Sequence, residues 1–432
     1  MSLSYVDFLA AKRTTSSAAG RPCTSDDVHP LLHDWQRELV AWAVRTGRAA
    51  IWADTGLGKT LMQLEWARLS GARVLVVAPL AVCQQTVREA ARVGMYAAYV
   101  TDDDEAAGPG VWVTNYERVR SFDPLGLDAV VLDEASILKQ SDGRTRTLLI
   151  EHFAPVRRRL SCTATPAPND PEELTNQAEF LGHMRRVDML AAYFVHDAAG
   201  WRLKGHARAP MLRWIASWAV ALRTPADLGY PADGYLLPGL EITPHLLPVN
   251  EVPEGQLFAT DLGGVSGRAR VRKSTLAARC ARAAELVEAE PGEPWLLWAG
   301  LNEEADELAR LTGAVNVHGS MSPEEKARLL LAFSDGDIDR LVTKPQIASL
   351  GMNWQRCARM AFVGLSDSYE QYYQAIRRCY RYGQDRVVHA HLVLSELEGQ
   401  IASNVAAKER DASRFTSSLV AEMRQLRMEA SA

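Results

Sequence analysis

The sequence lacks the features that mark membrane-spanning, secreted and cysteine-scaffolded proteins. It has no apolar run of about eighteen residues, so we expect no membrane span. Residues 1–20 place a short apolar patch before their basic residues, which is not the order of a secretory signal. The six cysteines, at positions 23, 83, 162, 280, 357 and 379, are scattered and form no C-x-x-C pair. This argues against a disulfide framework or a zinc site and fits a cytoplasmic protein.

An excess of one charge sign is also missing. The formal net charge is −5 over 432 residues, so the total does not imply a nucleic-acid partner. Such a partner would have to be held by local basic patches. The hydrophobic share of 47% and the charged share of 23% are typical of a globular protein, and the length suggests two or three domains.

The chain has no internal repeat, and apolar β-rich runs alternate with helical patterns in two sets. This is the βαβ rhythm of a buried parallel sheet. The first set comprises "AAIWAD", "RVLVVAP", "GVWVTNYE", "LDAVVLDEAS" and "RRRLSCTAT", and the second comprises "PWLLWAG", "AVNVHG", "DRLVTKP", "RMAFVG" and "RVVHAHLVLS". Between strands, "SPEEKARLLLAF" predicts a helix with Ser322 as N-cap, Pro323 at its first position and Glu325 closing a capping box.

The two sets predict an α/β protein with two parallel-sheet lobes, at residues 28–180 and 275–395. An N-terminal extension (1–27) precedes them, and a helical, charged tail (396–432) follows. The rhythm breaks at 181–274, which we expect to be an irregular insertion and linker. Within it, "YPADGYLLPGLEITPHLLP" indicates a crossing between the lobes.

A phosphate-binding turn is predicted by "IWADTGLGKTLMQLEWA", residues 51–67. A glycine-rich turn from a strand into a helix exposes backbone N–H groups that cradle an anion. Gly56 and Gly58 would allow close approach, Lys59 would reach the β/γ-phosphates, and Thr60 would hold Mg²⁺. Ala53 stands where the strict P-loop pattern has glycine. An ordinary strand–turn–helix with an exposed lysine is the alternative.

A strand that ends in acid, "LDAVVLDEAS", follows about 75 residues later in the same lobe. Asp133 would hold Mg²⁺, and Glu134 would orient and deprotonate the attacking water. A strand capped by solvated acids is the alternative, and the P-loop upstream favours the catalytic interpretation.

These residues resemble superfamily two helicases and translocases, most closely the Swi/Snf branch in a compact form such as phages encode. "ADTGLGKT" is similar to that superfamily's A-x-x-G-x-G-K-T, with Thr55 and Leu57 inside the nucleotide-binding loop. The resemblance implies that Gln36, in "LLHDWQRELVAWAV", contacts adenine. "LDEAS" resembles the D-E-x-x box, with Ser136 where many relatives have His or Asp. "SCTATPAPND" resembles the motif that couples hydrolysis to lobe movement, with Thr163, Ala164 and Thr165 at its centre.

The second lobe carries two further resemblances. "TKPQIASLGMNWQ" loosely resembles a segment that touches DNA and approaches nucleotide, which implies nucleic-acid contacts from Thr343 and Asn353 and a nucleotide contact from Gly351. "QAIRRCYRYGQ" is close to the branch's Q-A-x-x-R-x-H-R-x-G-Q. Gln374, Arg378, Arg381 and Gln384 match it, and Tyr380 replaces the usual His. Because the two arginines are three apart, we expect them to share a helix face and point at one phosphate chain.

The resemblance implies two RecA-like lobes with an ATP cleft between them, ATP and Mg²⁺ as cofactors, and hydrolysis coupled to movement along DNA, duplex or forked rather than RNA. It implies a bacterial or phage-infected cytoplasm and a monomer or weak oligomer, with a possible protein partner at 181–274. An RNA helicase of the same fold, a motor subunit of a restriction or remodelling complex, and a nucleotide-gated clamp that does no mechanical work are alternatives.

Two basic patches are further candidates for nucleic-acid contact. "WRLKGHARAPMLRWIASW", residues 201–218, mixes four basic residues with three tryptophans, a combination that binds backbone and stacks bases. However, Trp214 and Trp218 have i,i+4 spacing, which favours packing into the insertion's own core. "SGRARVRKST", with basic residues from Arg268 to Lys273, fits either a DNA-contacting loop or a solvated linker.

Overall fold

The computed structural model describes residues 19–139, 143–167, 170–197, 200–248, 272–347, 352–364 and 369–431. The chain divides into two compact units. Unit 1 comprises the described parts of Met1–Ala232 and Ala412–Ala432, and unit 2 comprises those of Asp233–Asp411. Among the residues described, no helix is both long enough and apolar enough to cross a membrane.

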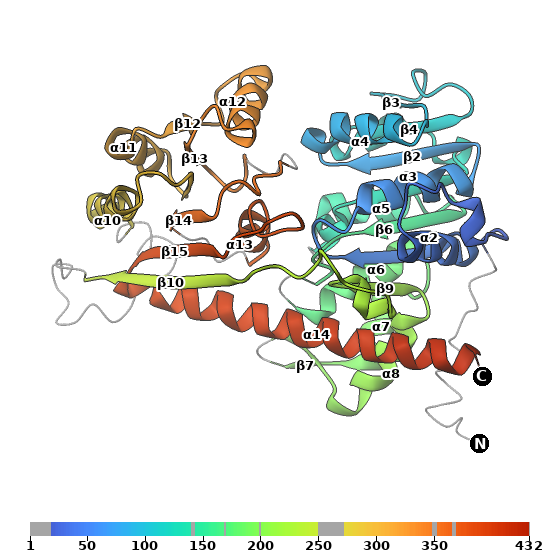
Figure 1. The fold of residues 1–432 in the computed structure, drawn as a ribbon. Coiled ribbons are helices and arrows are strands. Elements are labelled where there is room, and N and C mark those ends of the chain that lie inside the picture. The colour runs from blue at the N-terminus through green and yellow to red at the C-terminus, as the bar shows by residue number, and fades with distance from the viewer. Residues whose placement is uncertain are drawn as a thin grey trace. The chain divides into compact units, whose positions relative to one another are not determined.

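Unit 1 is built on a seven-stranded sheet in which every strand pair is parallel. Its order is β3-β4-β2-β5-β6-β1-β9, and Figure 1 labels β3, β4, β2, β6 and β9 of this sheet. The strands are β1 Arg48–Ala53, β2 Arg73–Ala78, β3 Ala97–Tyr99, β4 Gly110–Asn115, β5 Ala129–Asp133, β6 Arg158–Cys162 and β9 Ala219–Leu222. The inner strands are buried along almost their whole length, which explains why they read as continuous apolar runs.

Helices connect these strands, as the βαβ rhythm predicts. The α-helices of unit 1 are α2 Asp34–Thr46, α3 Lys59–Ser70, α4 Leu80–Arg92, α5 Arg144–His152, α6 Leu174–Leu181, α7 Arg186–Tyr193 and α8 Arg208–Ala216. Short 3-10 helices lie at Ser25–Asp27, Tyr116–Ser121, Pro124–Gly126, Ala135–Lys139, Pro171–Glu173, Gly205–Ala207 and Pro225–Leu228. An antiparallel pair, β7 Phe194–Asp197 and β8 Gly200–Leu203, stands apart from the main sheet.

Unit 2 contains a second parallel sheet, of six strands in the order β10-β15-β14-β11-β13-β12. Its strands are β10 Leu240–Leu247, β11 Trp295–Ala299, β12 Val315–Val317, β13 Arg340–Thr343, β14 Arg359–Val363 and β15 Val388–Ser395. Its helices are α10 Leu276–Ala289, α11 Asn302–Thr312, α12 Pro323–Asp335 and α13 Tyr369–Ile376, with a 3-10 helix at Glu396–Glu398. The predicted start of α12 is confirmed, because the Ser322 hydroxyl accepts from the Glu325 N–H at 3.2 Å.

The segment expected to be an irregular insertion contains regular elements. Helices α7 and α8 and strands β7, β8, β9 and β10 all lie within 181–274. Strand β9 extends the sheet of unit 1 beside β1, and β10 extends the sheet of unit 2 beside β15. Pro244 lies inside β10, where it is tolerated because β10 is an edge strand. The proline is the reason the sequence of this segment favoured an irregular structure over a strand.

The predicted helical tail is confirmed as α14, Gly399–Ser431 (Figure 1). In its last part, which belongs to unit 1, Leu419, Val420 and Met423 are buried. The Met423 sulfur accepts from the Ala221 N–H of β9 at 3.2 Å. Arg424 donates to the Ala226 carbonyl oxygen at 2.6 Å. This part of α14 therefore packs into unit 1.

Candidate nucleotide-binding site

The predicted phosphate-binding turn joins β1 to α3 in unit 1. Gly56 has a φ of +85° and Gly58 a φ of +74°, in the left-handed region that glycine adopts without strain. Helix α3 begins at Lys59, so its first N–H groups lie at the end of the turn. The Lys59 ammonium donates to the carbonyl oxygens of Ala53, at 2.8 Å, and Asp54, at 3.3 Å. The turn thus gathers a positive charge and a helix N-terminus, while Thr60 lies in the helix's first turn.

Gln36, predicted to contact adenine, lies against this turn. Its side chain is only 5% exposed. Its Nε2 donates to the Leu57 carbonyl oxygen at 2.9 Å, and its Oε1 accepts from the His33 N–H at 2.9 Å. A Cβ added to Gly58 would lie 2.5 Å from Gln36 Nε2. Adenine contact remains a prediction, and the structure adds that Gln36 fastens the turn to the start of α2.

The sheet brings the acidic strand end to the same edge as the turn. In the register of the three strands, Ile51 of β1 and Asp133 of β5 both pair with Cys162 of β6. Because all three strands are parallel, their carboxyl ends meet at one edge of the sheet, where α/β proteins bind ligands. The turn and Asp133 therefore lie one strand apart in space although they are far apart in the sequence.

Asp133 is buried and held by hydrogen bonds. Its Oδ1 accepts from Gln63 Nε2 at 2.7 Å and from the Glu134 N–H at 3.1 Å, and Oδ2 takes part in neither bond. Burial raises the pKa of the Asp133 carboxyl, while the Gln63 hydrogen bond and the charge of Lys59 act in the opposite direction. The positive charge of Lys59 therefore favours the ionised form of the Asp133 carboxyl.

Glu134 has an unusual backbone conformation. Its φ is +53°, and it is the one non-glycine residue with positive φ in the described part of the chain. A left-handed residue with a side chain costs about 1–2 kcal/mol, and such strain gathers at functional sites. Its Oε2 accepts from the Thr163 hydroxyl at 3.4 Å, and that hydroxyl accepts in turn from the Thr165 N–H at 3.1 Å. The predicted water-activating acid and the predicted coupling motif are thus joined directly.

Two glutamines that sequence reasoning missed hold these parts in place. Gln63 is fully buried on α3 against Asp133, one turn after Lys59 on the same helix face. A glutamine at that spacing in a buried stretch was the available signal. Gln177 of α6 binds three segments of unit 1. Its Oε1 accepts from Trp52 Nε1 at 2.9 Å and the Ser161 hydroxyl at 2.7 Å, and its Nε2 donates to the Pro166 carbonyl oxygen at 2.8 Å. No local pattern marks Gln177, because its partners come from distant parts of the sequence.

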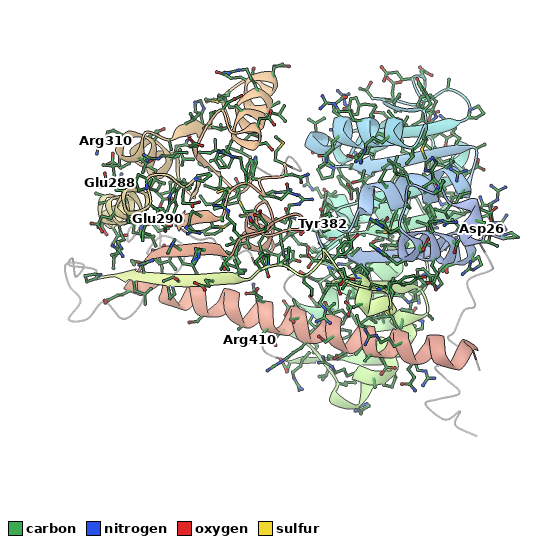
Figure 2. All side chains as sticks on the ribbon, in the orientation of Figure 1. Asp26, Glu288, Glu290, Arg310, Tyr382 and Arg410 are labelled. Carbon is green, nitrogen blue, oxygen red and sulfur yellow. The ribbon has the colours of Figure 1, made fainter. Side chains whose placement is uncertain are left out.

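In unit 2, the arginine motif differs from the expectation in one respect. Arg378 and Arg381 were expected on one helix face, and this is wrong, because α13 ends at Ile376. Both arginines lie half-buried in the turns that follow, where the Trp354 N–H donates to the Arg378 carbonyl oxygen at 2.9 Å. Gln374 lies half-buried on α13 itself. Tyr382, labelled in Figure 2, is 44% exposed in the same turns.

Gln384, which ends the motif, has a structural position. It is buried, and its Nε2 lies within hydrogen-bonding distance of the carbonyl oxygens of Gln355, at 2.9 Å, Cys357, at 3.1 Å, and Cys379, at 3.2 Å. Its Oε1 accepts from the Arg386 N–H at 3.0 Å. The residue therefore ties the arginine turns to the segment before β14.

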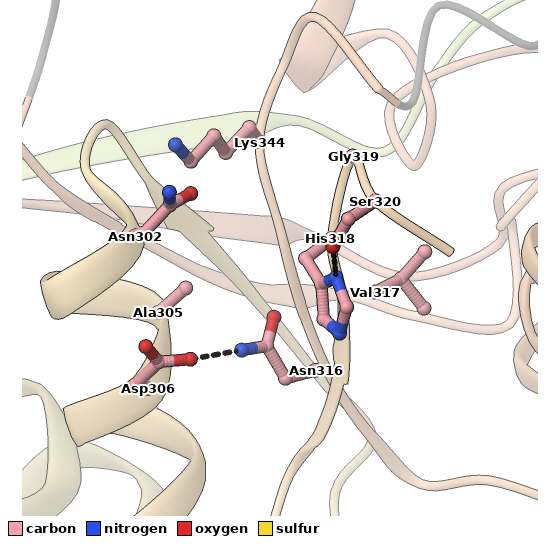
Figure 3. Close-up of a pocket in the computed structure, with 9 residues that line it drawn as sticks. All are labelled: Asn302, Ala305, Asp306, Asn316, Val317, His318, Gly319, Ser320 and Lys344. Carbon is pink, nitrogen blue, oxygen red and sulfur yellow. Dashed lines mark hydrogen bonds between the residues drawn. The ribbon is translucent and has the colours of Figure 1, made fainter.

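The predicted nucleic-acid contacts of unit 2 are not all accessible. Thr343 is fully buried and its hydroxyl donates to the Val317 carbonyl oxygen at 3.0 Å, so its side chain does not reach the surface. The next residue, Lys344, lines a pocket of about 360 Å³ together with Asn302, His318 and Ser320 (Figure 3). Asn353 is exposed, and Gly351 lies outside the described residues.

The structure describes residues 201–218 of the first basic patch in full and the second basic patch only in part. Trp218 is 2% exposed, stacked on His183 at 5.0 Å between ring centroids, and Trp214 lies edge-on to it at 5.4 Å. Trp218 is therefore a core residue, but it also packs edge-on against Trp52 of β1 at 5.8 Å, so this core is shared with the main sheet and is not the insertion's own, and Trp214 is half-buried. Of the second patch, residues 268–271 lie outside the described residues, and Arg272 pairs with Glu304 at 3.4 Å in a largely buried position. Arg272 is therefore not part of a solvated loop.

Comparison with known families finds two matches along the chain. Residues 33–174 match the DEAD/DEAH box helicase family, and residues 279–383 match the helicase conserved C-terminal domain. No curated protein matches the sequence. Among solved structures, the chain is similar to the Sulfolobus solfataricus SWI2/SNF2 ATPase core in complex with dsDNA, at 18% identity over 92% of this chain and 95% of that chain. The TM-score is 0.44.

The two family matches occur in the order expected for tandem RecA-like lobes, and each contains the predicted catalytic residues of its own unit. The first includes the turn, Asp133 and Thr163, and the second includes Arg378 and Arg381. The two parallel sheets agree with this assignment. The chain therefore belongs to the superfamily two helicases and is a nucleotide-binding, nucleic-acid-stimulated ATPase.

Proposed function

We propose that this protein is a DNA translocase of the Swi/Snf-like branch, which hydrolyses ATP to ADP and phosphate to move along the DNA backbone. The observation that carries the proposal is at one edge of the sheet of unit 1. There, the register of β1, β6 and β5 brings the turn at Lys59 to the same edge as Asp133 and Glu134. A lysine, a metal-binding acid and a water-orienting acid are the parts that phosphoryl transfer requires.

The residues present fit Mg²⁺ bound together with ATP. Burial of the Asp133 carboxyl opposes its ionisation. A cation bound beside the carboxylate would offset that energetic cost. The Thr60 hydroxyl is a second oxygen ligand of the kind Mg²⁺ prefers. When bound, Mg²⁺ neutralises charge on the β- and γ-phosphate oxygens. The chain's own part is to hold Asp133 with Gln63, so that the carboxylate is oriented before nucleotide arrives.

Each residue of the site has a step in this proposal. The N–H groups from Thr55 to Lys59 bind the phosphate chain, and the Lys59 ammonium exchanges its carbonyl partners for phosphate oxygens. Glu134 orients the attacking water and accepts its proton. The Thr163 hydroxyl donates to Glu134. Loss of the γ-phosphate beside Glu134 would therefore act directly on the coupling segment that contains Thr163.

From unit 2 we assign Arg378 and Arg381 to charge stabilisation on the γ-phosphoryl group, which a rigid guanidinium fork suits. Gln374 is assigned to the nucleotide as well, as the motif implies. Gln384 keeps the arginine turns in place through its three carbonyl partners. These assignments rest on the sequence motif at residues 374–384.

The choice of DNA rests on the same motif. Its ending, "YRYGQ", favours the Swi/Snf-like branch over the RNA-unwinding branch, whose motif usually ends in a second glycine–arginine pair. Movement along a backbone needs phosphate contacts rather than base readout. An RNA helicase of the same fold is the second candidate, and a motor subunit of a restriction or remodelling complex is a variant of the first.

The test is steady-state ATP hydrolysis with blunt duplex DNA, forked DNA, single-stranded DNA and RNA of the same sequence. We expect the duplex or forked DNA to stimulate hydrolysis most. Glu134→Gln is the matched control, because it keeps the size of the side chain while removing the base. It should bind ATP and show no stimulation. Stimulation by RNA alone would refute the DNA assignment in favour of the second candidate.

A further inference from the structure

The segment between the two family matches, residues 175–278, contains a surface that neither match covers. It includes the antiparallel ribbon of β7 and β8, here called the ribbon, Phe194–Asp197 and Gly200–Leu203. We propose that the ribbon is a nucleic-acid contact of unit 1, in which Trp201 stacks on an unpaired base and the neighbouring basic side chains contact phosphates. The inference rests on the proposed function and adds a binding surface to it.

The base of the ribbon is anchored to unit 1. Phe194 is 3% exposed and pairs with Leu203. The Lys204 N–H donates to the Tyr193 carbonyl oxygen at 2.9 Å, and Lys204 Nζ donates to the Ala191 carbonyl oxygen at 2.9 Å. The ribbon is therefore fixed where it leaves α7, so its outer residues are presented by a rigid support.

The outer part of the ribbon presents an aromatic pair. His196 and Trp201 are directly opposite in the register, with ring centroids 4.8 Å apart at an interplanar angle of 71°. This edge-to-face contact fixes the indole ring, while Trp201 remains 37% exposed. Trp218, in contrast, is buried between His183 and Trp52, and Trp214 packs on it. An exposed tryptophan held by a neighbouring ring is preorganised for stacking, and aromatic rings stack on any base because every base has a π-face.

The sequence around Trp201 is basic, although the 3-10 helix Pro171–Glu173, which contacts β8, is acidic. Residues 194–213 contain four lysine or arginine side chains and one aspartate, although the whole chain carries −5. The aspartate, Asp197, pairs with Arg202 at 3.3 Å, and the two side chains are 42% and 70% exposed. Exposed pairs of this kind are weak, so Arg202 can exchange its partner for a phosphate at small cost. Positive charge and one exposed ring together match a polyanion with stackable bases, and they do not match an apolar partner.

The geometry also separates the two kinds of contact. Side chains alternate between the faces of a strand, so His196 and Trp201 share one face and Arg202 lies on the other. Trp201 would therefore read a base on one side, and Arg202 would contact backbone on the opposite side. Single-stranded DNA, whose bases are unpaired, should depend on Trp201 more than blunt duplex does.

The first experiment measures equilibrium binding of the full chain to fluorescently labelled single-stranded and blunt duplex DNA, without nucleotide. Trp201→Ala should weaken single-strand binding by about tenfold, the scale for losing one stacked base. Trp201→Phe should keep most of the affinity, because a ring remains. Tyr96→Ala is the matched control, since Tyr96 is 73% exposed in the same unit and should be neutral.

The second experiment tests charge. Arg202→Glu should weaken binding of both DNA forms and lower the slope of log affinity against log salt by about one unit. Arg92→Glu is its control, because Arg92 lies 61% exposed in a comparable surface pair with Glu89 and should leave binding unchanged. ATP hydrolysis without DNA should be the same in all variants, which shows that the fold and the nucleotide site are intact.

The outcomes separate this inference from the proposed function. Loss of affinity in Trp201→Ala and Arg202→Glu, with neutral controls, supports the ribbon as a contact. Wild-type affinity in both ribbon variants, while DNA still stimulates the wild-type enzyme, overturns the ribbon and leaves the proposed function in place. Equal losses in Trp201→Ala and Tyr96→Ala also overturn it. A wild-type chain that binds no DNA refutes both.

Discussion

Replacing Gly58 by alanine tests how Gln36 holds the phosphate-binding turn. Gly58 has a φ of +74°, so any L-residue there costs about 1–2 kcal/mol. The new Cβ would also lie 2.5 Å from Gln36 Nε2 and displace its hydrogen bond to the Leu57 carbonyl oxygen. Losing a buried hydrogen bond costs about 1–3 kcal/mol. We therefore expect Gly58→Ala to destabilise unit 1 by about 3 kcal/mol and to weaken ATP binding.

A matched control isolates the contribution of Gln36. Gly94 has a φ of +65°, and a Cβ added there would meet no atom within 4 Å. Gly94→Ala should therefore cost only the backbone strain, about 1–2 kcal/mol. In a Gln36→Ala background, Gly58→Ala should cost no more than Gly94→Ala, because the obstructing amide is gone. Denaturant unfolding of the single and double variants measures these differences. Equal costs for Gly58→Ala and Gly94→Ala in the wild-type background would refute the reasoning.

Three further predictions concern catalysis and stability. Lys59→Ala should abolish nucleic-acid-stimulated hydrolysis, measured by phosphate release, because no other charge replaces the ammonium at the phosphates. Arg378→Ala should leave ATP binding largely intact and slow turnover by about 10³-fold, the scale for an arginine finger, and equal losses of binding and turnover would show a ground-state contact instead. Burial lowers the pKa of His183 to about 4. As pH falls below about 6.5, His183 therefore binds a proton in the unfolded chain but not in the folded chain, and the folded chain loses stability. Between pH 7 and pH 5 the wild type should lose about 2 kcal/mol of unfolding free energy that a His183→Gln variant does not lose, and parallel pH profiles in denaturant unfolding would contradict this.

The sequence predicted the sheets well because buried parallel strands leave a strong local signal. Every apolar run in the two predicted sets forms a strand of its expected unit. Strand β10 was not predicted, because its proline and its exposed positions reflect an edge location that only the tertiary fold defines. Strand β9, Ala219–Leu222, was not predicted because its short apolar run was not recognised as a strand.

The site was predictable where function demands a residue type at a fixed spacing. Lys59, Asp133 and Glu134 follow strands, and a parallel sheet brings such ends together. Contacts between distant segments had no such signal. The hydroxyl of Thr343 turns inward to a neighbouring strand, and Gln177 binds partners far along the chain. The helix expected at Arg378 ends at Ile376, and the Arg378 carbonyl oxygen accepts from the distant Trp354 N–H, a contact that no local pattern marks.

Displacement of a triplex-forming strand from duplex DNA tests the proposed motor most directly. The enzyme is added to a duplex that carries a short third strand ahead of a free end, with ATP, and release of that strand is followed over time. The account predicts release by the wild type and no release by Glu134→Gln at the same DNA occupancy. If duplex DNA stimulates hydrolysis but the third strand stays bound at every enzyme concentration, the protein is a nucleotide-gated clamp and the translocase account is wrong.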